Sequence, residues 1–402
     1  MVERSAPDSG KYLIRHIFHD YRDEICSSLS LTDTQKSAAL MISMCKTAEL
    51  GFNASVCPNC GIQLHYASCN NRNCPCCQWP SQQGWILQRK NEVIPDIPYY
   101  HIILTVPHDL NPLIRLNEKT LLGKLFSCSS QAVIDLCRDR RFLGAVPGIV
   151  SVLHTWKQNL LPHYHIHMIV SGGGLNPLGQ FISQNDPSRN RKKQPEFEGG
   201  FFLPIAALTN LFRGKMMDAV KRLWRKNLLA LPNGNTYSDP NGWAAFCESL
   251  YGTKWVGKIV KTFNGNGNAI EYLARYTFRT AISNSRILAY DGKTVTFSVT
   301  NRETGEKEPV SLPAMEFIRR FLFHVLPKGF TRVRYSGFLS NARKTRKLQS
   351  IYRQLHLPEY MPSPLTRASK RDLFLAIWNT DISICRCCGA QLIHLPRGQP
   401  LH

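Results

Sequence analysis

The segment from 163 to 170 constrains the fold of this chain more than any other, because histidines alternate along it with aromatic or aliphatic residues. Alternation is typical of a β-strand, whose successive side chains point to opposite faces. His163, His165 and His167 are therefore expected on one face and a continuous apolar surface on the other. The apolar surface predicts a covering layer of helices, and the histidine face predicts an open cleft.

Imidazoles two residues apart on a strand point the same way and can share one divalent ion. His165 and His167 are thus candidate ligands, with His163 beside them on the same face. The alternative is a solvated polar sheet face, which the clean apolar back of the strand disfavours. Taken alone, the triplet would equally suit a zinc-dependent hydrolase.

The surrounding pattern gives the fold class. Strands are expected at 99–106, 148–153, 163–170 and 255–263, and helices at 113–137, 206–229 and 268–279. The third strand is expected to end at the glycines 172–174. The order β-α-β-β-α-β-α predicts an α+β domain of the ferredoxin-like, split βαβ type. Outside it, 12–50 is expected to be helical, 180–200 an exposed loop, and 286–299 a hairpin that turns at Asp291-Gly292.

The last of these helices carries a second group of candidate residues. At about 100° per residue, four side chains fall on one face: Tyr272, Arg275, Tyr276 and Arg279. Phenols can attack phosphorus, and guanidinium groups neutralise charge on phosphate oxygens, so this face suits phosphoryl transfer. An ordinary amphipathic helix is the alternative interpretation.

Two CxxC pairs, Cys57/Cys60 and Cys74/Cys77, are separated by 13 residues, a spacing typical of one tetrahedral zinc site. Cys69 is a further candidate ligand between them. Disulfides or buried free thiols are the alternative, which the absence of an export signal disfavours. Near the end of the chain, Cys385-Arg-Cys-Cys388 is typical of half of another metal site, with His394 as a candidate partner.

The charge of the chain indicates a polyanionic partner. Fifty Lys and Arg residues stand against 28 Asp and Glu, a net charge of +22, so nucleic acid is the first candidate and a membrane surface the second. The 43% hydrophobic content excludes wholesale disorder, and no apolar run is long enough to span a bilayer. Residues 331–402 hold twelve basic and three acidic residues, with a focus at Arg343, Lys344, Arg346 and Lys347 that is expected to bind DNA phosphates.

In combination, the histidine strand and the tyrosine helix resemble the HUH endonucleases. The motifs also resemble, in order, those of rolling-circle insertion-sequence transposases of the two-tyrosine kind. They comprise Cys57-x-x-Cys60, 68–78, 101–107, 161–167, 212–215, 272–284 and 321–330. The resemblance spans about residues 50 to 350 and implies three regions: 1–90 with zinc, an HUH nuclease domain at 91–330, and a basic region at 331–402.

The resemblance also implies roles. His165 and His167 would bind Mg²⁺ or Mn²⁺, Tyr272 and Tyr276 would act as nucleophiles, and structural Zn²⁺ would occupy the cysteine module. Candidates for the third catalytic ligand are His101, Glu271, His163 and His154.

Two positions depart from the family pattern. Asn73 replaces a histidine of the family's cysteine block, so this position supplies no histidine ligand for zinc here. Phe278 replaces the histidine of the tyrosine motif, which therefore cannot be essential if this protein is active.

The implied partners are single-stranded element ends, target DNA and the host replication machinery, in the cytoplasm of a bacterium and associated with the nucleoid. Because these partners account for the charge, no membrane partner is expected. A host helicase is expected because the chain lacks a P-loop. Two alternatives remain open at this point. A plasmid replication initiator or relaxase would share the histidines and tyrosines. A non-catalytic zinc-containing DNA-binding protein would share only the charge and the cysteines.

Overall fold

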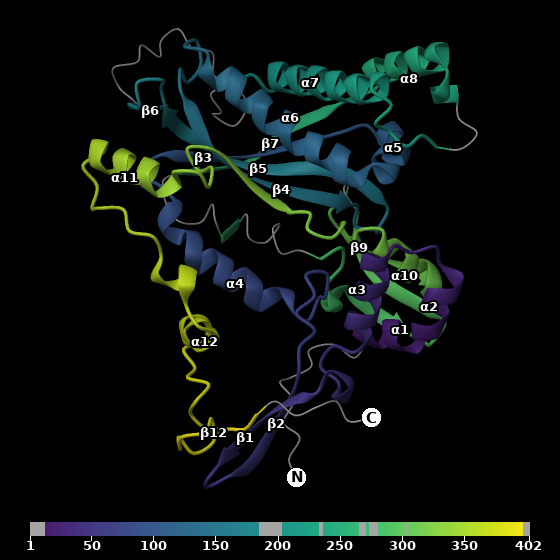
Figure 1. The fold of residues 1–402 in the computed structure, drawn as a ribbon, viewed down its shortest axis with the longest axis vertical. Coiled ribbons are helices and arrows are strands. Elements are labelled where there is room, and N and C mark those ends of the chain that lie inside the picture. The colour runs from purple at the N-terminus through teal and green to yellow at the C-terminus, as the bar shows by residue number, and fades with distance from the viewer. Residues whose placement is uncertain are drawn as a thin grey trace.

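The computed structural model describes residues 13–184, 203–232, 236–264, 271–272, 280–301 and 304–396. A mixed α/β architecture with antiparallel sheets organises them (Figure 1). The largest sheet has six strands in the order β11-β4-β5-β3-β7, with β6 paired to β5. Their bounds are β3 Pro98–Thr105, β4 Val146–Trp156, β5 Pro162–Leu175, β6 Phe181–Ser183, β7 Val256–Asn264 and β11 Val333–Gly337. The edge strand β11 thus comes from the region after residue 330.

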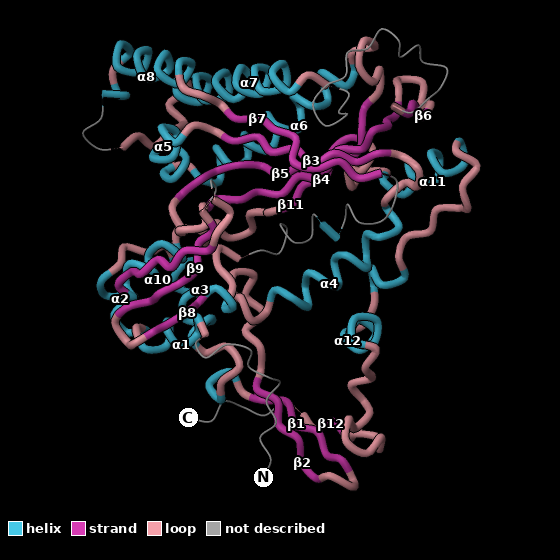
Figure 2. Tube along the Cα trace, turned by 180° about the vertical axis from the view of Figure 1, so that it is seen from behind, coloured by secondary structure: helices cyan, strands magenta, loops and turns pink. Residues whose placement is uncertain are grey.

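Helices cover both faces of this sheet (Figures 1 and 2). One face carries α5 Asn111–Leu116, α6 Glu118–Arg138, α7 Ile205–Arg225 and α8 Pro240–Gly252, and α4 Gln78–Arg89 and α11 Lys344–Gln354 lie on the other side. The core beneath α6 and α7 contains Tyr164, Ile166, Met168 and Val170 of β5. The expected apolar back of the histidine strand is therefore confirmed, and each buried side chain of this kind stabilises the fold by roughly 1.5–3 kcal/mol.

Strand β5 does not end at the glycines as expected, but continues through them to Leu175. A Cβ on Gly173 would lie 2.4 Å from Cζ of Phe181, and one on Gly174 would lie 2.5 Å from the carbonyl oxygen of Val146. The glycines therefore permit close approach of neighbouring strands and do not stop the strand. Helix α8 was also missed, although Asp239 caps it and Pro240 begins it, both recognisable start signals.

A second unit combines both halves of the chain. It contains α1 Ile14–Asp20, α2 Arg22–Ser28, α3 Asp33–Ser43, β8 Ile287–Tyr290, β9 Thr294–Thr300, β10 Lys307–Pro313 and α10 Ala314–Leu322. Phe18 meets Phe321 edge-on in its core, with ring centroids 5.2 Å apart. The helices expected in this unit are confirmed. The expected hairpin is confirmed as well, because β8 pairs with β9 across Asp291-Gly292, and Gly292 takes a positive φ of 89° in the turn.

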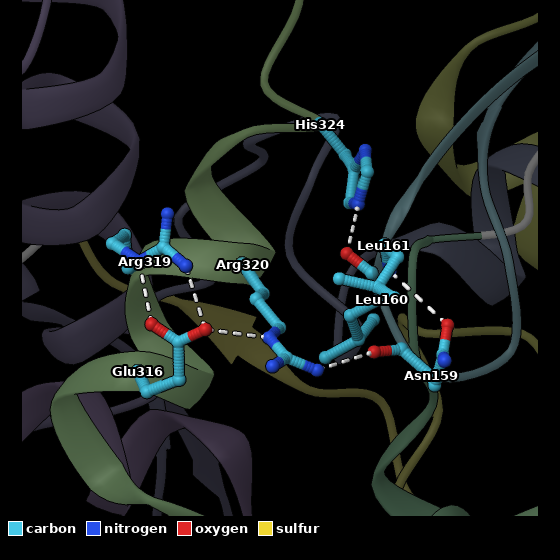
Figure 3. Close-up of polar contacts among 7 residues, drawn as sticks. All are labelled: Asn159, Leu160, Leu161, Glu316, Arg319, Arg320 and His324. Carbon is cyan, nitrogen blue, oxygen red and sulfur yellow. Dashed lines mark hydrogen bonds and ion pairs between the residues drawn. The ribbon is translucent and has the colours of Figure 1, made fainter. Parts of the chain in front are cut away.

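This second unit holds the turn between β4 and β5 (Figure 3). Arg320 donates to the carbonyl oxygen of Asn159 at 3.3 Å while its Nε pairs with Glu316 at 2.7 Å. His324 donates from Nε2 to the carbonyl oxygen of Leu160 at 2.9 Å. These contacts fix the hairpin formed by β4 and β5, and with it every side chain that the two strands display.

The third sheet joins the two ends of the described chain. Its order is β12-β1-β2, with β1 Phe52–Cys57, β2 Gly61–Tyr66 and β12 Ile393–His394. In Figure 1 the segment after α11 descends through α12 Lys370–Trp378 to this sheet, where Ser55 pairs with His394. Across the described ranges, every helix is too short or too polar to cross a membrane.

Candidate functional site

Three buried histidines converge on the face of the main sheet that lies opposite α6 and α7. His154 stands on β4, and His165 and His167 stand on β5, each offering a ring nitrogen within 4.8 Å of the others. His154 and His165 are direct partners in the antiparallel register, and His167 follows two residues later on the same face. The strand pattern thus predicted two members of this group, and the pairing of β4 with β5 supplies the third.

The hydrogen bonds of two of these rings determine which nitrogen can face an ion. Nδ1 of His165 lies 2.9 Å from the carbonyl oxygen of His163, so this nitrogen carries the proton and donates it. Nδ1 of His167 lies 2.8 Å from Nε2 of His101. With Nδ1 of each ring engaged in this way, Nε2 is the nitrogen that would bind a metal, the arrangement that commonly orients histidine ligands.

Burial keeps His101 in its neutral form. It lies on β3 and is fully buried. Burial lowers the pKa of His101 to about 4, and the nearby charges of His165 and Lys258 add to the effect. A neutral imidazole can accept the proton of His167 through Nε2, so His101 serves as a positioning residue for that ligand.

Tyr272 lies against the same group. Its ring meets that of His101 edge-on, with centroids 5.1 Å apart and an interplanar angle of 70°. Of the expected helix 268–279, the structure describes Glu271 and Tyr272, and both are helical. The other three residues predicted for that face, Arg275, Tyr276 and Arg279, lie outside the described residues.

The remaining candidates for the third ligand have other surroundings. His163 stacks on His108, with ring centroids 5.1 Å apart, and its carbonyl oxygen holds His165. Glu271 is exposed. Among the described residues, the geometry therefore favours His154 as the third member of the group.

A first cysteine cluster combines Cys45, Cys69, Cys74 and Cys77, whose sulfurs lie within 4.8 Å of one another. Sγ of Cys77 lies 3.6 Å from those of Cys45 and Cys69. Four thiolates at this separation suit tetrahedral zinc. Cys45 was missed because it stands alone in the sequence, 24 residues before Cys69, with no spacing motif.

The single set expected from the two CxxC pairs is therefore wrong. Cys57 and Cys60 lie at the tip of the hairpin formed by β1 and β2, whereas Cys69 follows the base of that hairpin. A strand of six residues spans roughly 20 Å, which separates the two CxxC pairs. Cys57 and Cys60 instead meet Cys385 and Cys388. His394, the expected partner of the last pair, belongs to β12.

Arg72 anchors the first cysteine cluster to the rest of the chain. Its guanidinium donates to the carbonyl oxygens of Phe330 at 2.5 Å and of Leu326 and Pro327 at 3.1 Å. The neighbouring Asn73, which stands where the resembled family has histidine, is buried and accepts from Arg332 at 3.4 Å. Cys45 completes a set of four sulfurs without a histidine at that position.

The four basic residues at the start of α11 divide into two pairs. Arg343 and Arg346 are exposed. Lys344 forms an ion pair with the buried Glu92, and Lys347 donates to the carbonyl oxygen of Gly337 at 3.3 Å. The first pair is available for phosphate, whereas the second holds α11 in place.

Comparison with known proteins agrees with these features. A family model described as "Putative transposase" matches residues 148–347, and one described as "Transposase zinc-binding domain" matches residues 17–106. "Putative transposase y4qJ" of Sinorhizobium fredii is 32% identical over 96% of this chain and 94% of its own length. "Transposase for insertion sequence element IS801" of Pseudomonas savastanoi is 26% identical over 90% of this chain and 84% of its own. No solved structure matches.

These matches define a DNA transposase with a zinc-binding domain. The chain belongs to the IS91-type family of rolling-circle insertion-sequence transposases.

Proposed function

We propose that this transposase is a metal-dependent HUH endonuclease that cuts and joins single DNA strands through 5′-phosphotyrosine intermediates. One observation carries the proposal: the ring of Tyr272 contacts His101, which is hydrogen-bonded to His167 in a group of three histidines. The antiparallel strand order β7-β3-β5-β4, with helices α6 and α7 on one face, supports a ferredoxin-like nuclease domain.

The histidine group fits a divalent ion. His154, His165 and His167 would hold it through ring nitrogens. Nitrogen ligands suit Mn²⁺ better than Mg²⁺, which is a hard cation that prefers oxygen ligands. When bound, the ion would polarise the scissile phosphodiester and neutralise its developing charge.

The residues of the chain perform the transfer itself. The phenol oxygen of Tyr272 loses its proton and forms a bond to phosphorus, and the bond from phosphorus to the 3′ oxygen breaks. The departing 3′ oxygen gains a proton and becomes the free hydroxyl that primes replication. Tyr276 would serve the second cleavage, and Arg275 and Arg279 would neutralise the phosphate oxygens. One ester replaces another, so a DNA hydroxyl can reverse the step without ATP.

The surroundings of this site suit single-stranded DNA. We assign positioning of the strands to the zinc-binding region within 1–90 and phosphate contacts to the region 331–402, mainly through Arg343 and Arg346. Host enzymes would supply unwinding and replication at the nucleoid. A plasmid initiator with the same chemistry is disfavoured, because the relatives are named as transposases over nearly the whole chain.

Adduct formation tests the proposal. The protein is mixed with labelled single-stranded element ends and Mn²⁺, and an adduct that survives SDS is expected. Tyr272→Phe combined with Tyr276→Phe should abolish the adduct, whereas Tyr251→Phe, at an exposed tyrosine on α8, should leave it unchanged. His154→Ala should abolish cleavage and spare DNA binding. An undiminished adduct in the double tyrosine variant would refute the assignment of the nucleophiles.

A further inference from the structure

The tip of the hairpin formed by β1 and β2 meets the end of the chain through four cysteines. The sulfurs of Cys57, Cys60, Cys385 and Cys388 all lie within 4.8 Å of one another. Sγ of Cys57 lies 3.4 Å from Sγ of Cys388, although 331 residues separate them in sequence. Four sulfurs about 2.3 Å from one tetrahedral ion would lie roughly 3.8 Å apart, so this group has the dimensions of a zinc site.

The two contributing turns have the same construction. Each is a CxxC pair followed directly by glycine, Gly61 in one and Gly389 in the other. Both glycines have positive φ, 82° and 75°, a conformation that residues with a Cβ rarely adopt. In the second turn the amide of Gly389 donates to the carbonyl oxygen of Cys385 at 2.9 Å. The same tight turn thus presents two sulfurs from each end of the chain.

The surrounding sheet has almost no apolar core to hold it together. Its buried cluster contains Cys57, Cys385 and Leu392, with Ala390 packed against them. The outer strand β2 is mostly exposed along its length. Units this small normally need a metal or disulfides in place of a hydrophobic core.

We propose that Cys57, Cys60, Cys385 and Cys388 bind a second structural zinc ion, which ties the C-terminal end of the chain to the N-terminal hairpin. The site is separate from the cluster of Cys45, Cys69, Cys74 and Cys77, and its last two ligands lie far beyond residues 17–106, the extent of the zinc-binding family match. The proposal does not depend on the nuclease chemistry.

Zinc at this place would close the chain into a ring. An isolated bridge between Ile384 and Gln391 closes the C-terminal turn, and the pairing of Ser55 with His394 joins the segment after it to β1. Gln63 also donates from Nε2 to the sulfur of Cys385 at 3.3 Å, so β2 reaches the C-terminal turn directly. Because metal binding contributes to folding free energy, the ion would hold the segment that passes through α12 against the N-terminal module.

Metal content of the full-length protein tests the inference. Zinc per chain is measured by plasma mass spectrometry in proteins that all carry His165→Ala and His167→Ala, so that the histidine group adds no zinc, and two ions are expected when the cysteines are unaltered. Cys385→Ser with Cys388→Ser should leave one ion, Cys57→Ser with Cys60→Ser should leave one, and the four changes together should still leave one. The matched control is Cys387→Ser, an exposed cysteine within the same turn, which should retain two. Two ions in the Cys385/Cys388 variant, or one when the cysteines are unaltered, would overturn the proposal.

Alkylation of the unaltered protein gives a readout that does not depend on variant folding. Cys60 and Cys388 are exposed, as are Cys26 and Cys387. Peptide mass spectrometry should find the first two protected from iodoacetamide until a chelator removes zinc, while the second two react at once. Protection that survives chelation and is lost on adding a reductant would mean a disulfide, and immediate reaction of Cys388 would mean no site. Either result would refute the second zinc ion.

Discussion

His101 and His167 lie on adjacent strands of the main sheet, with Nε2 of the first 2.8 Å from Nδ1 of the second, and both are buried. The two rings are nearly parallel, at 14°. The ring of Tyr272 meets the ring of His101 edge-on. His101 therefore couples the orientation of a proposed metal ligand to that of a proposed nucleophile.

His101→Phe is expected to weaken Mn²⁺ binding on the order of 10–100-fold, because His167 loses the partner that fixes its ring while the volume at this position is retained. Calorimetric titration with Mn²⁺ measures the effect. His154→Ala should reduce binding further, and His356→Gln, at an exposed site, should leave it unchanged. An unaltered affinity in His101→Phe would show that the hydrogen bond does not position the ligand.

Arg343→Ala combined with Arg346→Ala is expected to reduce the salt dependence of single-stranded DNA binding. The slope of log K against log salt is negative, and each lost phosphate contact reduces its magnitude by about 0.7, so the pair should reduce it by about 1.4. Fluorescence anisotropy at several salt concentrations measures the slope. Lys119→Ala with Arg140→Ala removes two exposed charges elsewhere and should leave it intact. Equal slopes in all three proteins would exclude α11 from the DNA interface.

His324 is expected to make the protein less stable in mild acid. Burial lowers the pKa of His324 from its ordinary 6.5 to about 4, and the neutral ring accepts from Thr155 and donates to Leu160. Because the unfolded chain binds this proton first, stability is full above pH 6.5 and falls as the pH drops towards 4, by about 2 kcal/mol at pH 5.

Urea unfolding at pH 7 and pH 5 checks this sign. In His324→Gln the loss of stability between the two values should be smaller by about 2 kcal/mol, since glutamine does not titrate there. His394→Gln, at an exposed histidine of β12, should retain the full loss. The same pH dependence in both variants would assign the effect to other groups.

Arg72→Ala is expected to lower the free energy of unfolding by about 1–2 kcal/mol, because three carbonyl oxygens lose a charged hydrogen-bond donor. The loss stays this small because Arg72 is exposed, so water can replace its guanidinium group. Thermal unfolding measures the loss. Zinc content should not change, since the four sulfurs of the first cluster remain. Loss of that zinc ion would instead mean that Arg72 supports the cluster itself.

Part of this architecture follows from local sequence. The alternation along 163–170, the strands β3, β4, β5 and β7, the helices α6 and α7 and the turn at Asp291-Gly292 arise from side-chain periodicity and turn chemistry, which depend on residues close in the chain. These patterns predicted β5 with its apolar back, and they predicted His165 and His167 as neighbours.

Which residues distant in sequence share a histidine or cysteine site was decided by the tertiary structure alone. His154 joins the histidine group because the register of β4 on β5 places it opposite His165. The hydrogen bonds from Arg320 and His324 to the turn between β4 and β5 hold that register. The CxxC pairs do not meet each other, because a hairpin of two six-residue strands stands between them. Sequence spacing limits which residues can meet within one turn or strand. Strand register and docking decide which distant residues share a site.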